Sequence, residues 1–105
     1  MTDLFKAQLK FMEMLPRLID KAHELGYLVT PGQLKRCQDC HVGRVNSLHK
    51  KGLAIDLNLF SPDGIYLQKT EHHRALGEFW ESLGGQWGGH WGDGNHYSIG
   101  YRGMK

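Results

Sequence analysis

The chain has 105 residues, of which 40% are hydrophobic, and its 13 basic and 11 acidic side chains leave a net charge of +2. This length predicts one domain, residues 1–105, with enough apolar side chains to form its own core. The charge is too small and too evenly mixed to indicate a nucleic-acid partner. No apolar run is long enough to cross a membrane, and the first residues lack a secretory signal pattern, so we expect synthesis in the cytoplasm.

The first two predicted elements are helices. Apolar residues recur at three- and four-residue steps over residues 3–25 and predict a helix with one buried stripe. Pro16 is expected to kink this helix or to divide it into two short ones. Gly26 stands where a C-terminal cap belongs. Thr30 followed by Pro31 is typical of a helix start, so a short helix is predicted over about 31–40.

The next elements form a predicted hairpin. Apolar and polar residues alternate from Leu53 to Phe60 and predict a strand with Asp56 and Asn58 on its polar face. Residues 61–64 have the composition of a turn. The chain is then expected to return as a partner strand over residues 65–67.

A third helix and a last strand complete the predicted order. Thr70 is expected to cap a helix over about 71–83. Residues 86–94 are rich in Gly and Trp and are predicted to form a loop, and residues 95–101 alternate like a strand. The order predicts an α+β fold, with a small antiparallel sheet packed against the N-terminal and central helices.

The residues with the clearest chemistry are His49, Asp56, Asp93 and His96. Two histidines and one carboxylate make a three-ligand zinc site with a fourth position for water, which is the arrangement of a catalytic zinc. His49, Asp56 and His96 are the predicted ligands, and Asp93 is then available as general base. Asp93 and His96 converge only if Asp93 lies in a loop, which the neighbouring glycines favour. The pattern therefore predicts a hydrolase with a zinc cofactor.

Two further side chains are expected to support the ligands. Asn58 and Ser47 are predicted to hydrogen-bond to ligand side chains and so orient them.

Two of the candidate site residues also have interpretations that involve no metal. Asp56, set among aliphatic residues, could instead be a buried carboxylate paired with a Lys or Arg. The Asp-Gly pair that begins at Asp93 could be turn chemistry alone.

The other histidines and two tryptophans are expected to be structural. Seven histidines are many for this length, but five of them have no partner at metal-binding spacing and are predicted to be surface or loop residues: His23, His41, His72, His73 and His90. Trp87 and Trp91 frame the Gly-rich loop and are expected to pack in the core rather than to contact a substrate.

Cys37 and Cys40, followed by His41, match the pattern of c-type haem attachment. Haem attachment also requires export and an apolar pocket, for which the sequence has no signal. A zinc knuckle would need a second Cys pair, and a redox motif would need a strand–helix context. We interpret the pair as two thiols near a helix end, reduced in the cytosol.

Two motifs together resemble a known family. Ser-x-His-x-x-Gly-x-Ala-x-Asp over residues 47–56 and Asp-x-x-His over residues 93–96 resemble the zinc peptidases that include D-alanyl-D-alanine carboxypeptidases and the dipeptidases of vancomycin resistance. The likeness is closest to small phage endolysins that are L-alanyl-D-glutamate endopeptidases, and it covers most of residues 27–98. It implies that His49, Asp56 and His96 bind zinc and that Asp93 is the catalytic base.

The resemblance also implies a further catalytic residue and a biological role. The segment 29–36 is similar to theirs, which makes Arg36 the candidate for polarising the scissile carbonyl and stabilising its oxyanion. The implied protein is a bacteriolytic hydrolase of peptidoglycan stem peptides, held in the host cytoplasm until it is released to the cell wall. We expect it to be a monomer. Two alternatives stay open: a D,D-carboxypeptidase, and a non-catalytic, zinc-stabilised wall-binding module, which would have no need of Asp93.

Overall fold

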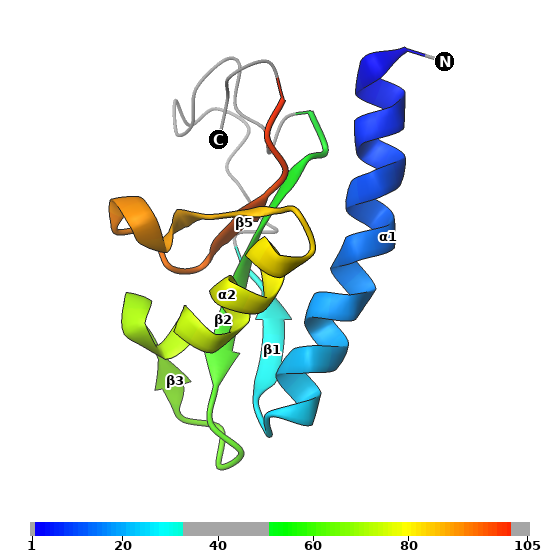
Figure 1. Cartoon of the computed structure of the whole chain (residues 1–105). Helices are drawn as coiled ribbons and strands as arrows, with labels where there is room; N and C mark the ends of the chain where they lie inside the picture. Colours follow the sequence, from blue (N-terminus) through cyan, green and yellow to red (C-terminus); the bar gives the residue numbers. More distant parts are fainter. Residues whose placement is uncertain (1, 33–50, 102–105) are drawn as a thin grey trace, which may run out of the picture.

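The computed structural model describes residues 2–32 and 51–101, which form two helices, two short 3₁₀ turns and a five-stranded antiparallel sheet (Figure 1). The predicted α+β fold is confirmed. Several predictions lie outside the described residues, namely most of the short helix over 31–40 and the side chains of Arg36, Cys37, Cys40, His41, Ser47 and His49.

Helix α1, Asp3–Glu24, runs along one side of the sheet (Figure 1). The Thr2 side chain caps its start by accepting a hydrogen bond from the Phe5 amide, 3.1 Å away. The predicted division at Pro16 does not occur. Pro16 is exposed, so the backbone carbonyl that loses its partner can bind water instead. The buried stripe comprises Phe11, Met14, Leu18 and Ala22.

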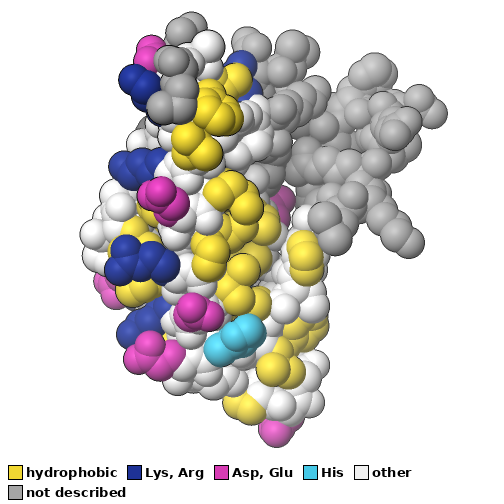
Figure 2. All heavy atoms as spheres, turned by 90° about the vertical axis from the view of Figure 1, so that its right-hand side faces the viewer, with side chains coloured by type: hydrophobic (Ala, Val, Ile, Leu, Met, Phe, Trp, Pro, Cys, Tyr) yellow, Lys and Arg dark blue, Asp and Glu magenta, His cyan; other side chains and the backbone are white. Residues whose placement is uncertain are grey.

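The outer face of α1 also carries apolar side chains. Phe5, Leu9 and Met12 are exposed and recur at four- and three-residue steps, so they share one side of the helix. Figure 2 shows hydrophobic side chains gathered along this face, with charged side chains beside them. No helix of the described residues has the length and apolar character needed to cross a membrane.

The sheet is organised around one long strand, β2, Ala54–Phe60. Strand β1, Leu28–Pro31, pairs with its second half on one edge. On the other edge β5, His96–Ser98, pairs with its first half and β3, Tyr66–Leu67, with its end. Strand β4, Gln86–Trp87, pairs with β5 and completes the order β1-β2-β5-β4.

The core lies between one face of this sheet and the two helices. Helix α2, Arg74–Ser82, crosses in front of the sheet beside α1 (Figure 1). Trp80 on α2 packs edge-on against Phe11 of α1 and Tyr97 of β5, with ring centroids 5.8 and 6.1 Å away. The leucines that face the core from β2 and from the residue before it are fully or almost fully buried: Leu53, Leu57 and Leu59. The predicted alternation along this strand is therefore confirmed, and Asp56 lies on the face opposite the core.

Two predicted helix starts are wrong. Pro31 ends β1 and pairs with Leu57, because an edge strand tolerates a residue without a backbone N–H. Thr70 begins the 3₁₀ turn η1, Thr70–His73, instead of capping α2, and its hydroxyl accepts a hydrogen bond from the Gly94 amide, 3.2 Å away.

The predicted turn, loop and last strand agree with the structure to different degrees. The predicted turn after β2 is confirmed by the hydrogen bond from the Gly64 amide to the Ser61 carbonyl. The predicted loop over residues 86–94 contains β4 and a second 3₁₀ turn, η2, Gly88–Trp91. The last strand is shorter than predicted, because the ladder of β5 ends at Ser98.

His73 is buried, so its predicted place at the surface is wrong. Its Nδ1 atom lies 2.7 Å from the hydroxyl of Tyr97, a partner 24 residues along the chain. Burial, together with the smaller effect of the charge of His72, lowers the pKa of His73 to about 4. Burial also raises the pKa of Tyr97, so the pair is neutral at ordinary pH.

Candidate metal centre

Asp56 and His96 meet on the face of the sheet opposite the core. They are direct cross-strand partners in the β2–β5 ladder, and such partners project to the same face. The Asp56 Oδ1 and His96 Nδ1 atoms are 3.6 Å apart, and each residue is only 7% exposed. The structure therefore brings together two of the three ligands predicted from sequence.

The separation of these two atoms fits two ligands of one zinc ion. Ligand atoms about 2.0–2.2 Å from a tetrahedral ion lie about 3.3–3.6 Å from each other. The observed 3.6 Å is at the upper end of this range and is longer than a direct N–H···O hydrogen bond. Within residues 2–32 and 51–101, no three potential ligand side chains form a cluster. The described part of the chain thus supplies two donors, and the third predicted one, His49, lies outside it.

Asp93 lies in the turn before β5, as the predicted convergence with His96 requires. Its backbone N–H donates to the Gly88 carbonyl at 2.8 Å, and its carbonyl accepts from the His96 N–H at 3.1 Å. A side chain on Gly88 would overlap the Asp93 carbonyl oxygen and place its Cβ 2.8 Å from that of His96. The Asp93 side chain is exposed and so accessible to a bound molecule.

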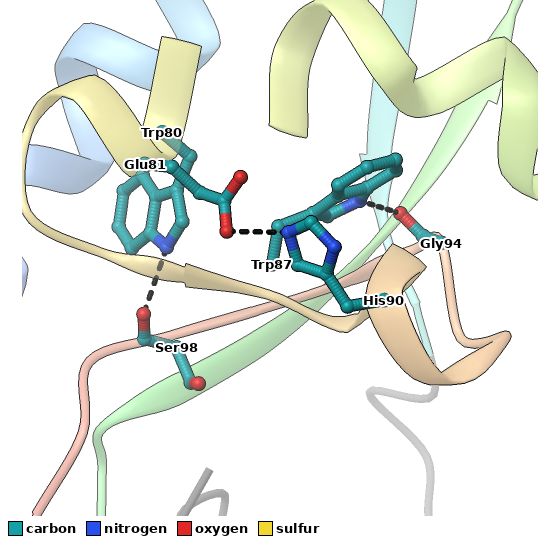
Figure 3. Close-up of polar contacts among 6 residues, drawn as sticks. All are labelled: Trp80, Glu81, Trp87, His90, Gly94 and Ser98. Carbon is teal, nitrogen blue, oxygen red and sulfur yellow. Dashed lines mark hydrogen bonds and ion pairs between the residues drawn. The ribbon is translucent and has the colours of Figure 1, made fainter. Parts of the chain in front are cut away.

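Two buried indole groups hold this turn and the far end of β5 (Figure 3). The Nε1 atom of Trp87 donates to the Gly94 carbonyl at 2.7 Å, while Thr70 accepts from the Gly94 amide. Gly94 stands between Asp93 and His96, so both of its backbone groups are fixed by partners outside the turn. The Nε1 atom of Trp80 donates to the Ser98 carbonyl at 2.8 Å and fixes the other end of β5. The prediction that Trp87 is a core residue is confirmed.

Trp91 is 44% exposed, so its predicted place in the core is wrong. Its ring packs against that of His96, with centroids 6.0 Å apart and planes at 60°. A bulky aromatic side chain therefore forms one wall beside the predicted ligand. Sequence reasoning misses this role because the Gly-rich stretch around Trp91 has no periodicity that assigns a face.

Two residues next to Asp56 have defined contacts. The amide oxygen of Asn58 accepts a hydrogen bond from the Tyr66 hydroxyl at 3.4 Å. Gly32 supports the strand at Asp56, because its N–H donates to the Asp56 carbonyl at 2.7 Å. A Cβ on Gly32 would lie 3.1 Å from that of Asp56. The sequence signal for this contact is the glycine that follows Pro31, at the end of a strand where the sequence pattern predicts the start of a helix.

Replacing Trp87 with Phe is expected to weaken metal binding more than the same change at Trp80. Both variants lose one buried indole N–H donor, and each leaves a carbonyl without its partner at a cost of about 1–3 kcal/mol. Of the two indole groups, only that of Trp87 bonds to Gly94, so of the two changes only the one at Trp87 loosens the turn between Asp93 and His96. Zinc titration and thermal melting of both variants provide the check, and equal zinc affinity at equal destabilisation would contradict the assigned role.

Comparison with known protein families identifies the chain. A family model described as D-alanyl-D-alanine carboxypeptidase matches residues 41–99, which is more than half of the chain. The chain belongs to the D-alanyl-D-alanine carboxypeptidase family. It is therefore a peptidase of the group that acts on peptidoglycan peptides, whose members are generally zinc-dependent. The match includes His49, Asp56, Asp93 and His96 and leaves out Arg36. No curated protein matches the chain.

Proposed function

We propose that this protein is a zinc metallopeptidase that hydrolyses the L-alanyl-D-glutamate bond of peptidoglycan stem peptides, as the small phage endolysins do, after its release to the cell wall. The observation that carries the proposal is the Asp56–His96 pair, 3.6 Å apart on the sheet face opposite the core and tied through the His96 backbone to Asp93. His49 is the proposed third ligand.

Each residue has a defined task in this proposal. A bound zinc ion supplies an acidified water molecule and polarises the scissile carbonyl. Asp56 and His96 would hold this ion, because they are opposite each other on hydrogen-bonded strands that set the spacing of their side chains. The exposed Asp93 carboxylate accepts the proton of the attacking water and then delivers it to the leaving amine. Arg36 stabilises the negative charge that develops on the carbonyl oxygen.

A D,D-carboxypeptidase is the nearest alternative, because the matching family carries that description. Such an enzyme needs a cationic group for the terminal carboxylate of its substrate. The resemblance of residues 27–98, which is closest to the small phage endolysins, favours the endopeptidase. The non-catalytic wall-binding module is disfavoured because a structural zinc site has no use for an exposed carboxylate held beside a ligand.

Mass spectrometry of the products released from purified murein tests the proposed function. Cleavage of the L-alanyl-D-glutamate bond yields peptides that begin with D-glutamate and leaves L-alanine on the glycan. We expect this pattern, its loss after chelation and its return when zinc is added. Release of free D-alanine would identify a carboxypeptidase, and binding to murein without any release would identify the module. Full activity after exhaustive metal removal would overturn the role of zinc.

A further inference from the structure

The sheet face that carries Asp56 and His96 extends well beyond them. In the register of β1, β2 and β3, Leu28 lies opposite Phe60 and Phe60 lies opposite Tyr66. Phe60 is four residues from Asp56 on the same strand, so all three side chains share the Asp56 face. We call these three residues the apolar row.

The apolar row is accessible and partly aromatic. Leu28 and Tyr66 are each 48% exposed, and the rings of Phe60 and Tyr66 are 5.4 Å apart. Exposed apolar side chains that lie side by side on one face indicate a contact surface more strongly than scattered ones do. The row contains no charged side chain.

Neutral polar side chains lie between the apolar row and the metal centre. Asn58 pairs with Thr30 on β1, and its amide oxygen accepts from the Tyr66 hydroxyl at 3.4 Å. The face therefore changes from metal ligands to neutral polar groups and then to apolar groups within four residues of β2. At about 3.3 Å per residue this distance is about 13 Å.

We propose that the apolar row binds a sugar ring of the glycan strand that carries the scissile peptide. This inference rests on the proposed function. In peptidoglycan, L-alanine is joined through a short lactyl linker to an N-acetylated sugar, so the ring lies about 10 Å from the bond that is cut. This distance from the scissile bond to the sugar is close to the distance along β2 from Asp56 to the apolar row.

The chemistry of the row favours the sugar over the rest of the stem peptide. Pyranose rings have apolar C–H faces that pack on aromatic rings. The sugars of the glycan disaccharide carry no charge near the lactyl linker. Beyond the scissile bond, the stem peptide is charged. It carries the free carboxylate of D-glutamate and the free amine of the diamino acid. Burying those charges against uncharged side chains would cost free energy. The glycan therefore lies over β2 and β3, and the departing peptide lies on the other side of the metal centre.

The test compares two substrates that differ only in the sugar. One is the disaccharide-linked stem peptide, and the other is the same peptide with an acetylated L-alanine. We expect wild-type protein to prefer the first by about tenfold in kcat/KM, chiefly through KM, since burial of a ring face contributes about that much. Tyr66→Ala is expected to reduce this ratio severalfold. Tyr66→Phe keeps the ring and loses only the hydrogen bond to Asn58, so it should retain most of the preference.

Ile65→Ala is the matched control. Ile65 is adjacent to Tyr66 and 62% exposed but is not part of the row, so its replacement should leave the substrate ratio at the wild-type value. A wild-type ratio near one, or a Tyr66→Ala variant that loses activity equally on both substrates, would overturn the inference and leave the proposed function standing. Failure of wild-type protein to cut either substrate would overturn the proposed function and this inference with it.

Discussion

Asp93→Asn is expected to lower kcat for murein hydrolysis by about 10²- to 10⁴-fold while zinc stays bound, because the amide cannot accept a proton from water. Asn matches Asp in size, and the contacts that position the turn are made by backbone atoms. The Asp93 N–H bonds to Gly88 and the Asp93 carbonyl bonds to His96, so both remain in the variant. Release of amino groups from murein measures the rate, and elemental analysis measures the zinc.

Two comparison variants separate loss of the base from loss of the metal. His49→Ala removes a predicted ligand and is expected to lose zinc together with activity. Asp63→Asn changes another exposed turn carboxylate, remote from the site in the Ser61–Gly64 turn, and should behave as wild type. Wild-type turnover in Asp93→Asn would show that Asp93 is not the base. Loss of zinc in that variant would instead make Asp93 a ligand.

The features that could be predicted from sequence are those indicated by short local patterns of residue type. Alternation along β2 places Asp56 opposite the core, and glycines around Asp93 put it in a turn. Once β5 pairs with β2, the antiparallel register brings His96 directly opposite Asp56. A local pattern of alternation or of turn residues is therefore enough to assign these three side chains to their faces and turns.

The features that could not be predicted depend on contacts between distant segments. Thr70 contacts Gly94 and His73 contacts Tyr97, each across 24 residues, and nothing in the local sequence marks either pair. Strand β4 has two residues, too few for alternation to show. Trp91 is a large aromatic residue of a kind that usually packs in a core, but it lies at the surface beside His96, directly before the turn at Gly92.

Acidification is expected to remove about 3 kcal/mol of folding free energy through His73 alone by pH 4. The unfolded chain binds a proton at His73 with a pKa near 6.5, whereas burial lowers the folded value to about 4. The stabilisation is therefore fully present above pH 6.5 and is lost as the pH falls toward 4. Denaturant unfolding at pH 7, 5.5 and 4 measures this, with His73→Gln expected to show a shallower dependence on pH and His23→Gln, at an exposed histidine, to match wild type. Parallel pH profiles for wild type and His73→Gln would place the acid sensitivity elsewhere.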